Sequence, residues 1–214
     1  MDDAEARDRL LDAAEPLFYA RGVQAVGMDE IRTASGVPLK RLYRVFPAKA
    51  DLVAAYLARR DGRWLGDLRA AVAAAPDDPL RAVYDWLADW FGEPDFRGCA
   101  FANAFGELGH TSDAVLDIVR GHKRALRGLL GEVAERTGGG PALADQLMLL
   151  TEGAIAVAAL DPGPEPARTA YRAAAALAGA GAGADMEADT GLGSDPDAGE
   201  GAVRARVRAP GPRA

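Results

Sequence analysis

The side chains best suited to chemistry in this sequence are a run of cations near its N-terminus. From Ile31 to Ala50 the chain has no acidic residue, and its basic residues there are Arg32, Lys40, Arg41, Arg44 and Lys49. Guanidinium and ammonium groups bind phosphate oxygens, and arginine also reads guanine edges in the major groove of DNA. The whole chain carries a net charge of −7, so this run forms a basic patch on an acidic body. The pattern predicts a nucleic-acid-binding surface; taken alone, it could equally be a solvated basic face.

The residues before these cations have the spacing of a short helix followed by a sharp turn. Residues 28–35 place Ile31 and Ala34 on one apolar face. Gly36 follows directly, where a positive φ costs a glycine least. Pro38 then suits the first turn of a new helix, because its missing N–H removes no helical hydrogen bond there.

The second short helix, at residues 39–45, leaves its cations on the outside. Leu42 and Phe46 face inward at a spacing of four, and the residues left facing outward are Lys40, Arg41 and Arg44. Two short helices, a glycine turn and a basic outer face predict a helix-turn-helix, whose second helix can enter the major groove.

The elements that must position this motif are all expected to be helices. Apolar residues recur at intervals of three and four, and no sustained alternation indicates a strand. The pattern predicts an all-α protein with helices at about 4–21, 28–35, 39–45, 48–75, 79–92, 98–109, 113–136, 142–160 and 165–179.

These helices divide the chain into two domains and a tail. We expect a helix-turn-helix DNA-binding domain at residues 1–48, and a helical ligand-binding and dimerisation domain at residues 49–180. Residues 181–214 are rich in Gly, Ala, Pro and charge, with few large apolar side chains. Such a segment cannot offset its own ordering entropy, so we predict a disordered tail.

The second domain contains the candidate ligand-binding residues. Trp86, Trp90 and Phe105 lie in helices, so they either belong to the core or line an apolar pocket, and the sequence favours neither alternative. Asn103 either orients a ligand through one hydrogen bond or has a structural role. The pocket alternative predicts a small apolar or aromatic effector.

Composition argues against several other classes of protein. Cys99 is the only cysteine, and with two histidines it cannot form a His/Cys metal site, so we expect no metal and no cofactor. The acidic N-terminus does not resemble a signal peptide, and charges interrupt every apolar stretch before about 18 residues. We therefore expect no membrane span and a cytoplasmic location. No paired carboxylates, nucleophile–base pair or phosphate loop stands out, so we do not expect an enzyme.

The stretch from Arg7 to Val53 resembles the N-terminal domain of the tetracycline-repressor (TetR) family. The matching residues are Ala13-Ala14, Phe18, Gly22, Asp29-Glu30-Ile31, Ala34-Ser35-Gly36-Val37, Leu42-Tyr43, Phe46-Pro47 and Lys49-Ala50-Asp51-Leu52. The resemblance implies a repressor that binds a palindromic operator in double-stranded DNA as a homodimer and releases it on binding a small-molecule effector. The candidate DNA contacts are then Leu39, Lys40, Arg41, Tyr43, Arg44 and Lys49.

The sequence departs from the family pattern at two places. The second helix of the motif begins Pro38-Leu39-Lys40-Arg41, where the family commonly has Ser-x-Gly-Thr, and Val26-Gly27 stands where a Thr or Ser usually precedes the first. Both departures bear on base preference, and neither removes the basic face.

The last two predicted helices are rich in small residues, which permit helices to approach closely. The resemblance favours a four-helix dimer interface there over a tightly packed monomer core. The alternatives for the whole chain are a helical small-molecule-binding enzyme and a protein-interaction module without a role at DNA.

Overall fold

The computed structural model describes the backbone of residues 1–188 and the side chains of residues 1–180, and this part of the chain is all-helical. Its helices are α1 (Asp3–Arg21), α2 (Met28–Ser35), α3 (Leu39–Val45), α4 (Lys49–Ala74), α5 (Pro79–Phe91), α6 (Ala100–Leu108), α7 (Asp113–Arg136), α8 (Pro141–Leu160) and α9 (Glu165–Ala188). The predicted fold class is confirmed.

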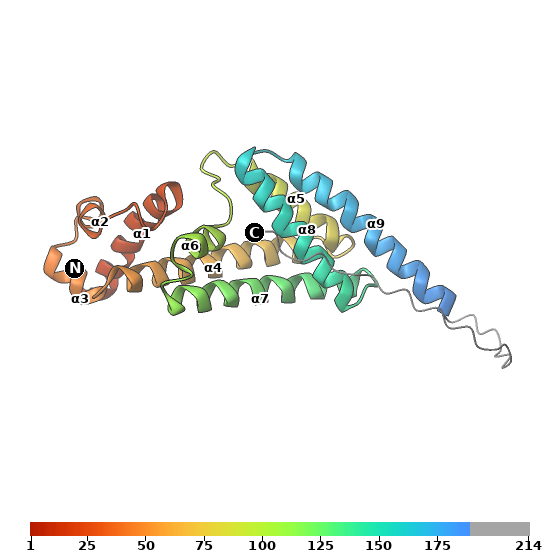
Figure 1. Ribbon diagram of the computed structural model, residues 1–214, viewed down its shortest axis with the longest axis horizontal. Helices are drawn as coiled ribbons and strands as arrows, with labels where there is room; N and C mark the ends of the chain where they lie inside the picture. Colours follow the sequence, from red (N-terminus) through yellow and green to blue (C-terminus); the bar gives the residue numbers. More distant parts are fainter. Residues whose placement is uncertain (189–214) are drawn as a thin grey trace, which may run out of the picture.

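The first three helices pack into a small bundle at one end of the elongated molecule (Figure 1). Asp2 caps α1 by accepting a hydrogen bond from the Glu5 N–H at 2.8 Å. Gly22 ends α1 with φ +86°, and Gly36 ends α2 with φ +66°. Both are left-handed conformations that glycine adopts without the steric penalty of a Cβ atom. The predicted turn at Gly36 is therefore present.

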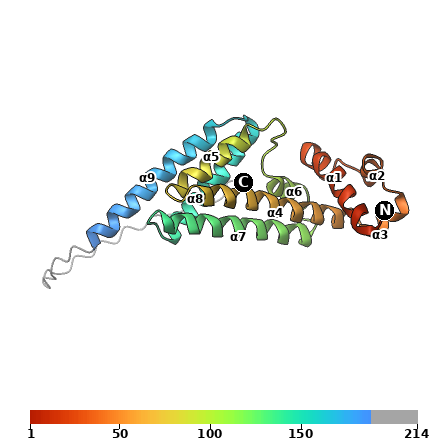
Figure 2. The same cartoon turned by 180° about the vertical axis from the view of Figure 1, so that it is seen from behind.

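The long helix α4 connects this bundle to the rest of the molecule. It leaves the bundle beside α1 and runs next to α7, as both ribbon views show (Figures 1 and 2). The helices α5, α8 and α9 pack together at the other end, and α6 lies between them and α1. A movement of α4 or α6 would therefore be transmitted to the first three helices.

The helix α9 is longer than the sequence predicts. We expected it to end near residue 179 and the tail to begin at 181, but residues 181–188 continue the helix. Gly179 and the glycines after it suggested a break; a glycine costs only about 1 kcal/mol in a helix, and the alanines between them are the best helix formers. The rest of the predicted tail, 189–214, lies outside the described residues.

The helix α8 is long and apolar enough to cross a membrane by length and composition alone, with a mean hydropathy of 1.5. This stretch is not evident from the sequence, because Asp145 and Glu152 interrupt its apolar residues. Core helices of globular proteins pass the same test, and α8 packs between α7 and α9. Glu152 also pairs with Lys123 of α7 at 2.6 Å. These contacts account for the buried part of α8, which is 39% of the apolar stretch; its exposed apolar residues are taken up below.

Candidate DNA-binding site and the helices that position it

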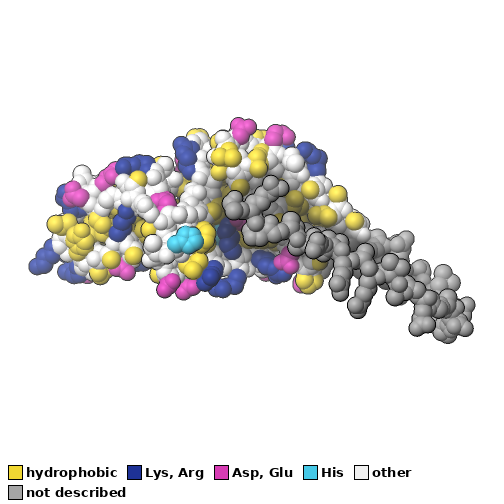
Figure 3. Space-filling view, viewed as in Figure 1, with side chains coloured by type: hydrophobic (Ala, Val, Ile, Leu, Met, Phe, Trp, Pro, Cys, Tyr) yellow, Lys and Arg dark blue, Asp and Glu magenta, His cyan; other side chains and the backbone are white. Residues whose placement is uncertain are grey.

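The outer face of α3 is the candidate DNA-reading surface. Leu42 is completely buried and anchors the helix on the bundle core. Leu39 and Tyr43 are about half exposed, at 51% and 48%, and Lys40 and Arg44 are exposed beside them. Figure 3 shows basic and hydrophobic side chains together at this end of the molecule. The structure thus places the predicted contacts of α3 on one accessible surface.

Arg41 and Arg44 both bind the side-chain carboxylate of Asp3, which lies near the N-terminus. Asp3 accepts hydrogen bonds from the guanidinium groups of Arg41, at 3.2 Å, and Arg44. Arg41 also donates to the Met1 carbonyl at 2.6 Å. A carboxylate is chemically similar to a DNA phosphate in the way it binds guanidinium. Asp3 therefore occupies groups that a phosphate or base would use.

Removing this carboxylate should strengthen DNA binding. We expect Asp3→Ala to raise affinity about two- to fivefold on operator and random DNA alike, because exposed ion pairs are individually weak. Fluorescence anisotropy with labelled duplexes measures both affinities. Asp8→Ala is the control, since it removes the same charge from an exposed position of the same helix. Equal gains from the two substitutions would indicate general charge repulsion and contradict a specific contact.

Lys49 lies at the first turn of α4, close to the helix-turn-helix. Its ammonium group donates to the Gln24 carbonyl at 3.2 Å. Asp51, one turn into the same helix, accepts from the Ala48 N–H at 2.9 Å and caps the helix. Lys49 is thus held between the α1–α2 turn and α4 rather than extended into solvent.

The α1–α2 turn is also held by α6, far away in the sequence. The Glu107 carboxylate accepts from the backbone N–H groups of Val23, at 3.1 Å, and Gln24, at 2.7 Å. The Gln24 side-chain amide donates to the Glu107 carbonyl in return. A Cβ on Gly22 would lie 2.7 Å from a Glu107 oxygen, so the contact also requires this glycine. The role of Glu107 is not visible in the sequence, because no local pattern links residues so far apart.

A second set of contacts fixes α1 to α4 and to the α5–α6 loop. Glu15 is 13% exposed and binds three arginines of α4, which are Arg59, Arg60 and Arg63. The Tyr19 hydroxyl donates to the Gly98 carbonyl at 2.9 Å and accepts from the Arg97 N–H at 3.0 Å. The first three helices are therefore attached to the body through α4 and α6 together.

Breaking the Glu107 contact should uncouple the two parts of the molecule. We expect Glu107→Ala to keep its fold but to lose protection of the Val23 and Gln24 amides, which hydrogen–deuterium exchange reports. An effector typically changes affinity at a second site by about 5–150-fold. We expect the change in DNA affinity that an effector causes to be smaller in Glu107→Ala than in the wild type. Glu132→Ala on α7 is the exposed control. Unchanged exchange at the α1–α2 turn would contradict this role.

The tryptophans proposed for a pocket form a closed cluster. Trp86 and Trp90 stack with ring centroids 5.8 Å apart, and both pack edge-on against Trp64, at 5.0 and 5.4 Å. The space enclosed by Trp64, Trp90, Phe101 and His122 is only about 10 Å³, which holds a single water at most. In this conformation the inner side of the cluster is packed core, while its outer edge at Trp64, Trp86 and Trp90 borders a surface hollow of about 150 Å³, smaller than a usual small-molecule site.

The other two predicted ligand contacts lie elsewhere. Asn103 is exposed, and its amide donates to the Arg97 carbonyl at 3.0 Å. Phe105 is 40% exposed and faces a separate cleft on α7. The structure therefore brings Trp86 and Trp90 together but does not place Asn103 or Phe105 beside them. The spacing within α6 alone could not show which face of that helix meets α5.

His122 is the buried titratable group next to this cluster. It is 2% exposed, stacks on Phe101 with centroids 3.7 Å apart, and its Nδ1 lies 2.7 Å from Asp61 Oδ1. Burial lowers the pKa of His122 below its ordinary value of 6.5, while the hydrogen bond with Asp61 opposes this shift.

This lowered pKa predicts how stability depends on pH. Below pH 6.5 the His122 imidazole is protonated in the unfolded chain but stays neutral in the folded protein. The free energy of unfolding therefore decreases as the pH is lowered, until the pH passes below the pKa of His122 in the folded protein. We expect denaturant midpoints to decrease from about pH 7 to about pH 5, and the decrease to be smaller in His122→Gln. His110→Gln, the only other histidine and an exposed one, is the control. Identical pH profiles for the two variants would contradict the prediction.

Among the described residues, no three His, Cys, Asp or Glu side chains come together as a metal site. Cys99 is buried at the start of α6, and its sulfur lies 3.5 Å from the Lys123 ammonium group. The polar groups of this region are therefore arranged as ion pairs and helix caps.

Comparisons with known proteins agree with the geometry. Residues 10–56 match the model of the bacterial regulatory proteins of the tetR family. The crystal structure of SCO4454, a TetR-family transcriptional regulator from Streptomyces coelicolor, superposes with a TM-score of 0.73 and 34% identity, covering 84% of this chain and 97% of that one. NemR of E. coli, with 23% identity, a TM-score of 0.70 and coverage of 78% of this chain and 94% of that one, shares the fold.

The curated relatives match over shorter stretches. The HTH-type transcriptional activator FasR of Mycolicibacterium smegmatis is 38% identical over 96 residues, which are 44% of this chain and 43% of that protein. The match covers less than half the length of each curated relative.

The fold and the exposed face of α3 define a DNA-binding transcriptional regulator of the helix-turn-helix class. The chain belongs to the TetR family of bacterial regulatory proteins. Its homologues are transcriptional regulators rather than enzymes, so the enzyme alternative is set aside.

Proposed function

We propose that this regulator is a homodimeric repressor that binds a palindromic operator and releases it when a small molecule binds its larger domain. The exposed basic face of α3, seated on the helix-turn-helix, is the observation that supports this function best. Residues 1–48 form the DNA-binding domain, and the regulatory domain begins at residue 49 and includes α9 to Ala188. Such a protein acts in the cytoplasm, where its DNA is.

The DNA contacts of the proposal divide by chemistry. Arg41 and Arg44 reach base edges and phosphates from α3. Tyr43 offers a hydroxyl to a phosphate, and Leu39 offers an apolar contact. Lys49 donates to a phosphate from the first turn of α4.

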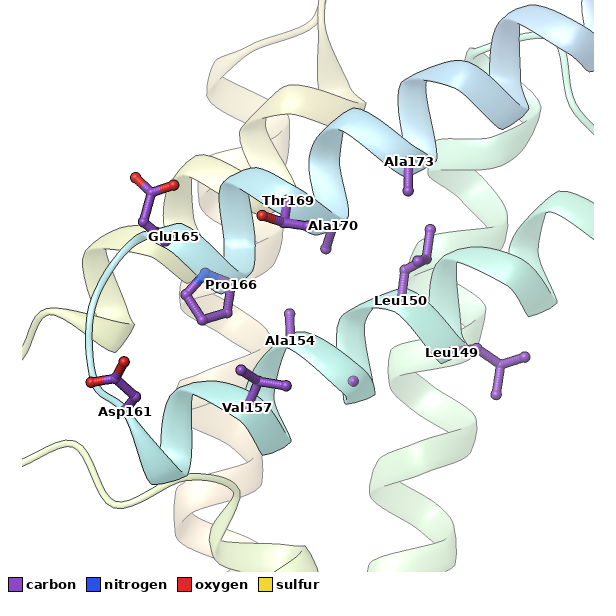
Figure 4. Close-up of a pocket in the computed structure, with 11 residues that line it drawn as sticks. Leu149, Leu150, Ala154, Val157, Asp161, Glu165, Pro166, Thr169, Ala170 and Ala173 are labelled. Carbon is purple, nitrogen blue, oxygen red and sulfur yellow. The ribbon is translucent and has the colours of Figure 1, made fainter.

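The dimer is supported by an apolar stripe along α8. Its exposed large residues are Leu149 at 75%, Val157 at 56% and Leu160 at 90%. They follow helical spacing, so they share one face. Leu149 and Val157, together with α9, border an open groove of about 510 Å³ (Figure 4). In that view Leu150 and Ala154 of α8 point toward Ala170 and Ala173 of α9, so the floor of the groove is apolar and consists of one leucine and three alanines. A second copy of the same two helices would cover both the stripe and the groove.

The effector is proposed to be apolar or aromatic. Trp86 and Trp90 would contact it if the closed cluster opens, whereas Asn103 and Phe105 lie away from that cluster and would contact an effector only at the surface of α6. Because the cluster is packed in this conformation, binding there requires selection of a more open state.

A gel shift with genomic fragments at low and moderate salt tests the regulator function. We expect a small set of fragments to remain bound when salt removes non-specific binding, because phosphate contacts alone are strongly salt-dependent. Binding that vanishes equally from every fragment would contradict operator recognition. The selected fragments then supply the operator for every experiment below.

Activation is a second candidate function. The name of the relative FasR describes a transcriptional activator, and the fold permits either outcome, since the operator's position relative to the promoter decides it. Expression of a reporter gene driven by the selected fragment, measured with and without the protein, distinguishes repression from activation.

A further inference from the structure

A surface cleft of about 470 Å³ lies between α6 and α7, away from the tryptophan cluster. Its apolar wall is Phe105, Leu116 and Val119, and its basic rim is Arg120, Lys123 and Arg124. Small-molecule sites usually measure about 300–1,000 Å³; the cleft falls in that range but is broadly open to solvent, so a ligand there would lie along a surface. Figure 3 shows hydrophobic side chains next to basic ones along this part of the molecule.

The cleft residues of α7 form one stripe. Leu116, Arg120 and Lys123 follow one another at intervals of four and three, which places them on the same helix face. Phe105 faces them from α6 with 40% of its surface exposed. The stripe thus combines an unburied aromatic surface with adjacent cations.

The cations of the rim differ in their partners. Lys123 is paired with Glu152 at 2.6 Å, so its charge is already compensated. Among the described residues, Arg120 and Arg124 have no carboxylate within 4.0 Å. Two guanidinium groups that no described carboxylate pairs with, beside an apolar wall, are complementary to a molecule with an anionic head and an apolar body.

We propose that the α6–α7 cleft binds an amphipathic small-molecule carboxylate and is the effector site of this regulator. The apolar body packs on Phe105, Leu116 and Val119, and the carboxylate accepts hydrogen bonds from Arg120 and Arg124. The regulatory part rests on the proposed function above, which it deepens by naming the chemical class of the effector.

The position of the cleft explains how its occupant reaches the DNA-binding domain. Phe105 and Glu107 lie on the same short helix, α6. Glu107 holds the α1–α2 turn through Val23 and Gln24, and Gln24 in turn accepts a hydrogen bond from Lys49. A ligand that fits one position of α6 better than another shifts the population of the attached helix-turn-helix.

Three probes of the same shape and different charge test the recognition. They are 4-phenylbutyrate, 4-phenylbutan-1-ol and 4-phenylbutylammonium, titrated into the full-length protein by isothermal calorimetry. We expect the carboxylate to bind at least about tenfold more tightly than the alcohol, because hydrogen bonds to charged groups are strong. The ammonium compound should bind weakest. Equal affinities, or no binding of the carboxylate, would overturn the proposal.

Substitutions then locate the site. The double variant Arg120→Gln/Arg124→Gln should weaken 4-phenylbutyrate binding about tenfold or more and leave the alcohol unchanged. Leu116→Trp should fill the cleft and weaken both compounds. The control is Arg127→Gln, an exposed arginine of the same helix that pairs with Asp145 outside the cleft. Circular dichroism establishes that each variant is folded. Equal losses in the control and the double variant would contradict the cleft as the site.

The last measurement links binding to DNA. We expect 4-phenylbutyrate to lower operator affinity in the wild type and to have no effect in the double variant at the same concentration. Calorimetric binding without any change in operator affinity would overturn the effector role. If no DNA fragment is bound specifically, the proposed function fails, while the calorimetry still decides whether the cleft recognises carboxylates.

Discussion

The Val157→Arg variant is expected to be a folded monomer with greatly weakened operator binding. Val157 is 56% exposed on the apolar stripe of α8 and borders the groove between α8 and α9. A guanidinium there costs little in the free subunit, because it reaches water. In a two-fold dimer it would be buried together with its symmetry mate, and two unpaired charges would be desolvated. Linking two binding events raises affinity about 10²–10⁴-fold without new contacts, so loss of the dimer should remove that factor.

Sedimentation equilibrium measures the mass, and anisotropy with a full operator and a half-site measures the affinity. Ala70→Arg, at an exposed position of α4, is the matched control and should remain dimeric. Affinity for a half-site should be almost the same in both variants. A dimeric Val157→Arg protein would mean that the interface lies elsewhere.

The Arg41→Ala variant is expected to lose specific binding far more than non-specific binding. Arg41 lies in the first turn of α3, where side chains of a recognition helix reach base edges. A bidentate contact to guanine is worth about 1–3 kcal/mol, so two half-sites together should lose roughly 2–6 kcal/mol. A base contact of this kind forms only at the correct sequence, so binding to random DNA should change little.

Lys49→Ala provides the contrast for this experiment. A phosphate contact carries no sequence information, so this variant should weaken all duplexes equally and make the salt dependence shallower by about one unit per half-site. Equal losses on operator and random DNA in Arg41→Ala would show that Arg41 also contacts only phosphate.

The helices could be predicted from the sequence because their signals are local. The periodicity of apolar residues and the Gly and Pro positions determined the bounds of α2, α3 and α7 without error. The end of α9 was wrong because alanines and glycines alternate there, and neither hydrophobic periodicity nor a clear break is present. The helix-turn-helix could be predicted for the same reason, since its glycine turn and cations lie within one short stretch.

The contacts that join the two domains could not be predicted from local patterns. Glu107 and Gln24 are far apart in the chain, and so are Asp3 and Arg44. Only the packing of α1 against α3 and of α6 against the α1–α2 turn brings them together. Asn103 and Phe105 lie apart from Trp86 and Trp90 for the same reason. Helical spacing identifies which side chains share a face, but not which neighbour that face meets.

The acidic N-terminus has a consequence for how the protein finds its operator on a chromosome. Asp3 occupies Arg41 and Arg44 in the free protein, so under the proposed DNA contacts it would have to be displaced at every DNA site, correct or not. The ratio of the affinity for the operator to the affinity for random DNA is then unchanged. Each complex with random DNA, however, has a shorter lifetime than it would have without Asp3. A genome offers about 10⁶–10⁹ competing sites, and a searching molecule spends most of its time on them. A built-in competitor carboxylate therefore speeds the search at the expense of residence time.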